Sequence, residues 1–141
     1  ACSLGGMQDA LNRALSYAKE RKQFGQAIAD FQSAQFKLAD MLTELVAARQ
    51  MVRLAAYKLD SKDAQASTYC AMAKRFATDA GFNVCNDALQ LFGGYGYIRE
   101  YPMERHVRDT RVHQILEGTN EIMRVIISRK LLMDGALEVI K

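Results

Sequence analysis

The chain has no tryptophan, one proline and three cysteines among its 141 residues. Proline breaks helices, so the isolated Pro102 leaves room for long ones. Cys2, Cys70 and Cys85 form no CxxC pair and are odd in number, which argues against a disulfide framework and favours a reducing compartment. Cysteines inside helices are usually inert core residues.

Histidine is also scarce, which limits the chemistry that the chain can carry out. His106 and His113 are the only two, and they are not combined with closely spaced cysteines in a zinc motif. We therefore expect no metal site. No serine or cysteine is marked as a nucleophile by its neighbours, and a Ser-His-Asp or Cys-His arrangement formed by folding stays open.

Long apolar runs and a strong charge of one sign are missing too. No run approaches the ~20 apolar residues that a membrane-spanning helix needs, and the first residues show no secretory-signal pattern. The net charge is only +3, and the basic residues alternate with acids, which argues against a nucleic-acid partner.

What is present is typical of one globular domain. Half of the residues are apolar (50%) and 25% are charged, and the chain is long enough to bury one core. The sequence lacks an initiator methionine and opens inside an expected helix. We therefore expect a fragment of a longer polypeptide.

Apolar residues recur at helical spacing. Leu38, Leu45, Val52 and Leu59 are each seven apart, which predicts an apolar stripe along a helix of about eight turns. Similar stripes predict one helix before it, one after it and a last helix from about Thr119. The further members of these stripes are Leu4, Met7, Leu11, Ala14, Leu15, Ala18, Met41, Leu42, Ala48, Ala55, Tyr69, Ala73, Phe76, Ala80, Val84, Ala88, Leu91, Ile122, Val125, Ile126 and Leu132.

The segment before the last helix predicts a break and a short helix. Its clustered glycines indicate a loop, and Pro102 followed by Met103 suits the first turn of a helix. No stretch alternates apolar and polar residues at period two. We predict an all-α domain, an up-down four-helix bundle with three long helices and a short extra helix before the last main helix.

Three short stretches stand out, and each has a simple structural explanation. KQFGQ suits a helix stop with an aromatic anchor, GGYGY a loop whose glycines allow positive φ, and LEGTNE a helix start capped by Thr119. A lone Gly-Gly-x-Gly is weak evidence of phosphate binding, because it does not follow a strand.

Taken together, in this order and at these separations, the three stretches resemble the acyl-CoA dehydrogenase family. The resemblance covers essentially the whole chain, residues 1–141, and is to the C-terminal helical domain of a longer enzyme. Within the family the chain looks most like the isobutyryl-CoA and other short or branched-chain members. The family's signature is matched by Gln90, Gly93, Gly94, Gly96, Tyr97, Glu100, Arg105 and Asp109.

The resemblance implies that Glu117 is the catalytic base. In the family this acid takes a proton from the α-carbon of an acyl-CoA while a hydride leaves the β-carbon for N5 of FAD, giving a trans-2-enoyl-CoA. Its backbone N–H also donates to the thioester carbonyl. Leu116 and Gly118 would lie at the substrate, Gly118 leaving room for the thioester. Burial under Ile115 and Leu116 would favour the neutral acid, whereas the helix N-terminus at Thr119 would favour the carboxylate.

The resemblance also implies FAD as the cofactor. Arg21 suits a pyrophosphate because its planar fork pairs two oxygens. Glu121 replaces a glutamine of many relatives, and its carboxylate would repel a pyrophosphate unless it turned away or paired with Arg124. The candidate cofactor-binding residues are Arg21, Gln23, Phe24, Gln32, Gln90, Gly93, Gly94, Thr119 and Glu121.

Partners and location follow from the same resemblance. In the family the FAD contacts around Arg21 and Gln90 come from a neighbouring subunit, so we expect a homo-oligomer, a dimer of dimers, that passes electrons to an electron-transfer flavoprotein. We expect the mitochondrial matrix in a eukaryote or the cytoplasm in a bacterium, and an inactive isolated fragment. Two alternatives stay open: a helical bundle used only for assembly, and an acyl-CoA oxidase of similar fold.

Overall fold

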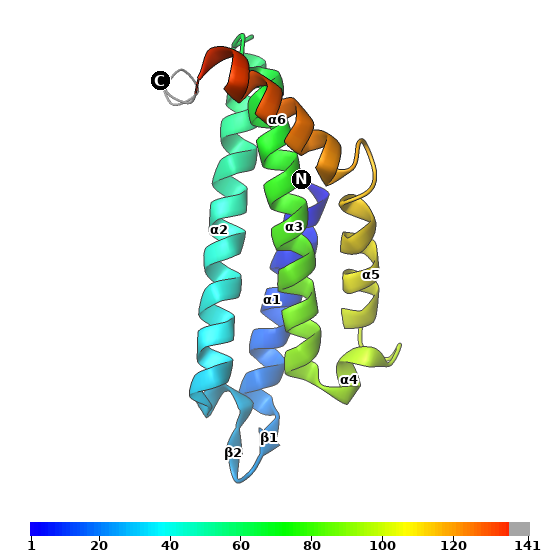
Figure 1. Ribbon diagram of the computed structural model, residues 1–141. Helices are drawn as coiled ribbons and strands as arrows, with labels where there is room; N and C mark the ends of the chain where they lie inside the picture. The colour runs from blue at the N-terminus through cyan, green and yellow to red at the C-terminus, as the bar shows by residue number, and fades with distance from the viewer. Residues whose placement is uncertain (136–141) are drawn as a thin grey trace.

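The computed structural model describes residues 1–135 and consists mainly of helices (Figure 1). Three long helices, α1 (Cys2–Glu20), α2 (Gln32–Asp60) and α3 (Ala66–Phe92), lie side by side in alternating directions. The predicted all-α class is therefore confirmed. The 29 residues of α2 make the expected eight turns at about 3.6 residues per turn.

Shorter elements connect and flank the long helices. Between α1 and α2 the chain forms a small antiparallel hairpin and a 3₁₀ turn, which the sequence pattern did not predict. Beyond α3 come a single helical turn, a helix of three turns and the last helix. These elements are β1 (Lys22–Gln23), β2 (Gln26–Ala27), η1 (Ile28–Asp30), α4 (Gly94–Tyr97), α5 (Met103–His113) and α6 (Asn120–Asp134).

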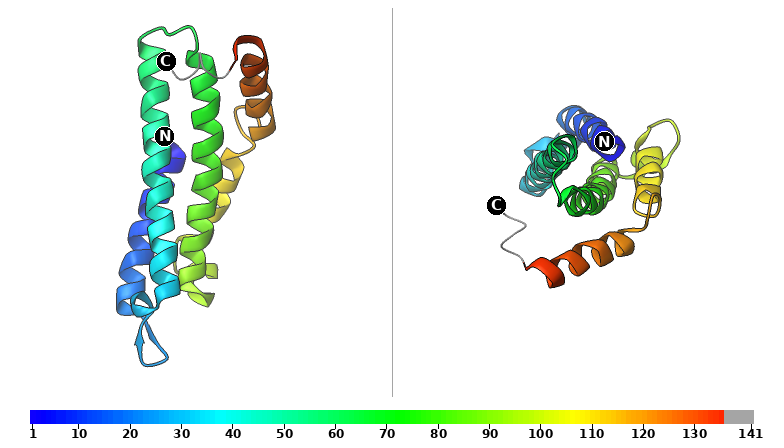
Figure 2. Two further views of the ribbon diagram at one scale, coloured as in Figure 1. Left: turned by 60° about the vertical axis from the view of Figure 1, so that its left-hand side comes forward. Right: turned by 90° about the horizontal axis from the view of Figure 1, so that it is seen from above.

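Helix α3 is the centre of the arrangement, because it packs against α1, α2, α5 and α6. Helix α5 runs beside α1 and α3, and it is the predicted short helix before the last one. The chain then turns, and α6 crosses the face of α3 obliquely near one end of the bundle (Figure 2). The loop between α5 and α6 is thus held over the side of α3.

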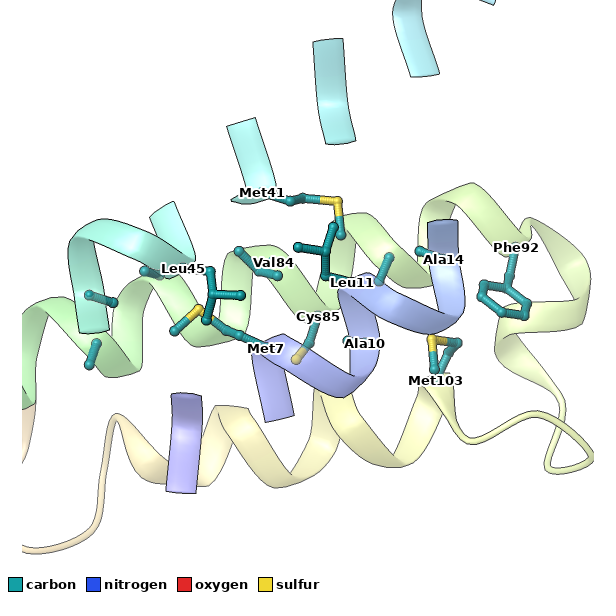
Figure 3. Close-up of a cluster of buried hydrophobic side chains, with 14 residues drawn as sticks. Met7, Ala10, Leu11, Ala14, Met41, Leu45, Val84, Cys85, Phe92 and Met103 are labelled. Carbon is teal, nitrogen blue, oxygen red and sulfur yellow. The ribbon is translucent and has the colours of Figure 1, made fainter. Parts of the chain in front are cut away.

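The core lies between the long helices, where large apolar side chains meet faces of alanine (Figure 3). Met7 of α1, Met41 and Leu45 of α2, and Val84 of α3 are each at most 1% exposed. Met103 is fully buried and joins the start of α5 to the same core. Small residues let the helix backbones approach and pack tightly. The core alanines are Ala10, Ala14, Ala48, Ala77, Ala80 and Ala88.

The predicted apolar stripes are buried only where another helix of this chain covers them. Leu42 and Leu59 of α2 are 52% and 60% exposed, so the expected stripe on α2 was too wide. On α6, Ile122 and Leu132 are 51% and 85% exposed, whereas Met123 is buried. Periodicity predicts a helix and its apolar face, but it does not show which part of that face meets a neighbour.

The single turn α4 stands where the sequence predicted a loop. Gly96 is buried against the end of α3, where an added Cβ would lie 2.5 Å from the carbonyl oxygen of Leu89 and 2.9 Å from Cβ of Phe92. Such distances leave no room for a methyl group. Glycine at this position therefore lets α4 pack directly on α3.

This contact predicts that Gly96→Ala lowers the free energy of unfolding by about 1–3 kcal/mol, since the added methyl group meets backbone. Gly5→Ala is the matched control. Gly5 lies within α1 with open space around the added Cβ, so its replacement should raise stability by about 0.5–1 kcal/mol. Urea denaturation measures both, and wild-type stability of Gly96→Ala would contradict the close packing.

Candidate functional site

The predicted site residues form two groups at opposite ends of α1. Arg21 follows the last residue of α1 and lines a cavity shared with the hairpin and α4. Glu117 lines a groove beside Ala1 and Cys2, where α1 begins. Since α1 has 19 residues and a helix rises ~1.5 Å per residue, the two groups are separated by about 28 Å. A single chain therefore does not bring the two groups of residues into one site.

The cavity beside the hairpin has a volume of about 730 Å³. Apolar and aromatic side chains form most of its wall together with a few polar groups, a composition typical of small-molecule sites. Gln32 is exposed at the start of α2 and does not line it. The predicted cofactor residues that do line it are Arg21, Gln23, Phe24, Gln90, Gly93 and Gly94.

Arg21 is positioned by its backbone and by an aromatic ring. Its N–H donates to the carbonyl of Tyr17, and its carbonyl accepts from the N–H of Ile28, both at 2.8 Å. Its guanidinium carbon lies 5.3 Å from the centroid of the Tyr95 ring on α4, a cation–π contact. Within residues 1–135 no carboxylate forms an ion pair with Arg21, so its charge is available to an anionic ligand.

The hairpin presents an exposed aromatic ring at its tip. Phe24 and Gly25 have φ of 53° and 84°, as a type I′ turn between paired strands requires. The ring of Phe24 is 93% exposed, and its centroid lies 6.3 Å from that of Phe31 in an edge-to-face contact. This ring is available to a ligand or to another subunit.

Two glycines keep the opposite wall of the cavity open. Gly93 ends α3 with φ 60° and ψ −136°, a conformation that is essentially restricted to glycine. Its N–H donates to the carbonyl of Gln90 at 3.0 Å. An added Cβ at Gly93 or Gly94 would meet nothing within 4 Å, so the backbone here is accessible from the cavity.

The second group is built on a turn with left-handed backbone. Glu117 and Gly118, between α5 and α6, have φ of 56° and 87°. Glycine suits position 118 because a side chain is strained at φ 87°, and an added Cβ would also displace Cε of Met123, which would lie 2.8 Å away. Thr119 then begins α6 as predicted, its Oγ1 accepting from the N–H of Ile122 at 3.4 Å. A left-handed glutamate is uncommon, since a side chain disfavours this conformation.

Glu117 lines a groove of about 440 Å³ between α1, α2, α3 and the loop before α6. Its side chain is exposed, and Ile115 and Leu116 are themselves 51% and 50% exposed. This chain therefore does not supply the apolar cover that we expected from these two residues. The N–H of Glu117 has no acceptor in the part of the chain that the structure describes. Apolar residues of the groove are Val52, Ala55, Ala56, Ala73, Ala77 and Leu116.

A polar network that the sequence pattern did not predict holds the loop to α3. Asn120 is only 3% exposed, and its Nδ2 donates to Asp79 Oδ1 at 2.6 Å and to Thr78 Oγ1 at 2.9 Å. Its Oδ1 accepts from Nζ of Lys74 at 2.7 Å. Gln114 Nε2 donates to the same Asp79 oxygen at 2.8 Å. The only signal in the sequence was a polar residue directly after a helix cap.

Glu121 makes the pairing that the sequence suggested. Its Oε1 accepts from Nη1 of Arg124 at 3.4 Å, and its side chain is 79% exposed. The other guanidinium nitrogen, Nη2, lies 3.5 Å from Asp79 Oδ2. Thr119 and Glu121 lie at the start of α6, close in sequence to Glu117. Neither residue lines the cavity at Arg21.

The histidines and the buried cysteine have structural contacts. His106 Nε2 lies 2.7 Å from Asp9 Oδ2, and His113 Nδ1 lies 2.9 Å from Ser3 Oγ, so both histidines join α5 to α1. Burial raises the pKa of the Cys85 thiol to about 11. Across residues 1–135 no group of three or more His, Cys, Asp or Glu side chains is placed to hold a metal ion. The same residues include no helix with the length and apolarity to span a membrane.

Comparison with known proteins identifies the family. The family model "Acyl-CoA dehydrogenase, C-terminal domain" matches residues 1–132. The mitochondrial isobutyryl-CoA dehydrogenase of Dictyostelium discoideum is 58% identical over 134 residues, which cover 95% of this chain and 32% of that protein.

Two solved structures have the same fold. Butyryl-CoA dehydrogenase from Megasphaera elsdenii matches with a TM-score of 0.89 and 45% identity, over 92% of this chain and 34% of its own. An FAD complex of PigA matches with a TM-score of 0.88 and 36% identity, over 94% and 34% of the two chains. The chain thus spans about a third of the length of the relatives it matches. It belongs to the acyl-CoA dehydrogenase family, of which it matches the C-terminal domain.

Proposed function

We propose that this chain is the C-terminal helical domain of an FAD-dependent acyl-CoA dehydrogenase and that Glu117 is its catalytic base. The observation that carries the proposal is the left-handed turn of Glu117 and Gly118, which lies beside a groove of about 440 Å³. The isobutyryl-CoA and butyryl-CoA dehydrogenases among the similar proteins support a short or branched-chain acyl-CoA as substrate.

Each residue of the turn has a role in this proposal. The Glu117 carboxylate takes the proton from the α-carbon of the thioester. Gly118 leaves space for the thioester next to the base, and Leu116 forms part of the wall around the acyl group. The N–H of Glu117, which has no acceptor within residues 1–135, donates to the thioester oxygen and stabilises the negative charge that develops there.

The cavity at the hairpin fits part of a dinucleotide. FAD would supply the acceptor for the hydride that leaves the β-carbon. Arg21, which has no carboxylate partner in the described chain, would bind the pyrophosphate, while Gln23 and Gln90 offer polar groups from the same wall. The open backbone at Gly93 and Gly94 admits the ligand closely. Phe24 and Gln32 would contact it from the hairpin and the start of α2.

The distance between the two groups of residues supports a site shared by subunits. Arg21 lies at one end of α1 and Thr119 near the other, about 28 Å away by the helical rise over 19 residues. We propose that one flavin is bound by the Arg21 cavity of one subunit and by Thr119 and Glu121 of another. A dimer of dimers would contain such pairs, with an electron-transfer flavoprotein as electron acceptor.

The proposal also covers the position of this domain in a longer protein, the cellular location of that protein and the activity of the isolated chain. The match to a C-terminal domain and the coverage of about a third of each relative support a longer protein, with the rest of the acyl and flavin sites on the other domains. The isolated 141 residues would then have little or no turnover. A mitochondrial relative supports the matrix as the location in a eukaryote, and the cytoplasm is the corresponding place in a bacterium.

Replacing Glu117 tests the base. In the full-length protein, Glu117→Gln should keep bound FAD and slow its anaerobic bleaching by isobutyryl-CoA about 10²- to 10⁴-fold, because the amide cannot accept the proton. Asp60→Asn, which changes an exposed carboxylate at the last residue of α2, is the matched control and should bleach at the wild-type rate. Unchanged bleaching in Glu117→Gln would show that another group is the base.

The same full-length protein also distinguishes a dehydrogenase from the two alternatives, an oxidase and an assembly module. A dehydrogenase is reoxidised rapidly by an electron-transfer flavoprotein and slowly by oxygen, whereas an oxidase shows the reverse order. A colourless protein that assembles normally would favour the assembly module.

Replacing Arg21 tests the cofactor cavity. Arg21→Gln should weaken FAD binding roughly 10- to 100-fold, because a charge-assisted contact to the pyrophosphate is lost. Arg13→Gln is the matched control on the same helix, since Arg13 pairs with Asp9 on an exposed face and should leave FAD binding unchanged. FAD released on dialysis and its absorbance in the retained protein give the measurement. Equal retention of FAD by both variants would refute the role of Arg21.

A further inference from the structure

The turn at Glu117 needs a restraint from outside itself. Glu117 and Gly118 are consecutive left-handed residues, and this conformation costs a non-glycine residue free energy. The Thr119 cap acts only on the first turn of α6. The Glu117 side chain has no hydrogen bond within residues 1–135 that would fix it. The orientation of this carboxylate therefore depends on how the backbone of the loop is held.

Lys74 of α3 provides that restraint. Its Nζ donates to the carbonyl oxygen of Gly118 at 2.8 Å and to Oδ1 of Asn120 at 2.7 Å. One ammonium group thus holds the residue after Glu117 and the first residue of α6 on the side of α3. Hydrogen bonds from a charged donor are stronger than neutral ones.

The partners of Lys74 are fixed in turn. The amide of Asn120 donates to Asp79 Oδ1 at 2.6 Å and its backbone N–H donates to the carbonyl of Gln114 at 3.0 Å. Gln114 Nε2 also donates to Asp79. The loop is thereby closed at both ends onto two groups of α3, Lys74 and Asp79. Few alternative positions of the loop keep all of these bonds.

Lys74 also brings a positive charge next to the base. Burial lowers its pKa, and the carboxylates of Asp79, Glu117 and Glu121 act in the opposite direction. Its two acceptors are oxygen atoms, which favour the ammonium form. The charged or titratable groups around it are Asp79, Arg75 and Cys70 on α3, Glu117 in the loop, Glu121 and Arg124 on α6, His113 on α5, and Cys2 with the amino group of Ala1 at the start of α1.

We propose that Lys74 is a positioning residue for Glu117: its ammonium holds the left-handed turn against α3 and thereby fixes the direction of the carboxylate. This inference rests on the proposed function of Glu117. Lys74 also lines the groove beside Glu117, and in this scheme it acts through the Gly118 carbonyl.

The test is the anaerobic reduction of bound FAD in the full-length protein, followed by stopped flow at several concentrations of isobutyryl-CoA. Lys74→Met should slow the limiting rate of flavin reduction roughly 10- to 100-fold with FAD content unchanged. The isobutyryl-CoA concentration that gives half of this rate should stay at its wild-type value, because only the direction of the Glu117 carboxylate is lost. Lys74→Arg should recover part of the rate.

Two further variants serve as controls. Lys58→Met is the matched control, because Lys58 Nζ also donates a hydrogen bond, to Asp63 Oδ2 at 2.7 Å, but in the turn between α2 and α3 rather than in the loop before α6. It should leave the limiting rate unchanged. Lys74→Gln keeps a neutral donor, so it decides the matter if Lys74→Met does not fold. Its limiting rate should lie between those of Lys74→Met and the wild type.

The outcomes separate this inference from the proposed function. A wild-type rate in the Lys74 variants, with slow reduction in Glu117→Gln, would overturn the role of Lys74 and leave Glu117 as the base. A lower rate that comes with lost FAD or weaker isobutyryl-CoA binding, and that Lys74→Arg does not restore, would show a purely structural lysine. Wild-type reduction in Glu117→Gln would overturn both proposals.

Discussion

The close packing of α3 against its neighbours is the constraint on which the rest of the structure depends. One side of α3 carries alanines such as Ala77 and Ala80, which admit the large side chains of α1 and α2 into one core. Another side carries Lys74 and Asp79, which bind the loop before α6. The helix that builds the core therefore also sets the position of Glu117, and a shift in core packing would move the candidate site.

The two groups of candidate residues are both open to solvent in the single chain. The cavity at Arg21 has a cation without a carboxylate partner in the described residues, open glycine backbone and an exposed Phe24 ring. The groove at Glu117 has a carboxylate without an apolar cover. These features lie at opposite ends of α1. The proposed site, assembled from two copies and from further domains, would account for both.

Backbone conformation is where the candidate base departs most from ordinary local preference. A glutamate at φ 56°, followed by a glycine at φ 87°, is maintained by contacts from α3 and by the cap at Thr119. Strain of this kind persists only where the surroundings fix it, and it is concentrated at functional sites. The polar network around Asn120 thus does more than stabilise α6, since it holds the loop that contains the proposed base.

The sequence by itself determined the helices, the cap at Thr119, the short helix after Pro102 and the family, because these depend on periodicity and on local motifs. It also led to Glu117, Arg21 and the glycines through resemblance. Only the tertiary structure decided that α6 crosses α3, that Leu59 is exposed, and that Lys74 reaches the loop. These facts depend on which helix faces pack together, and the residues that meet are about 40 positions apart in the sequence. Neither hydrophobic spacing nor local propensity encodes that pairing.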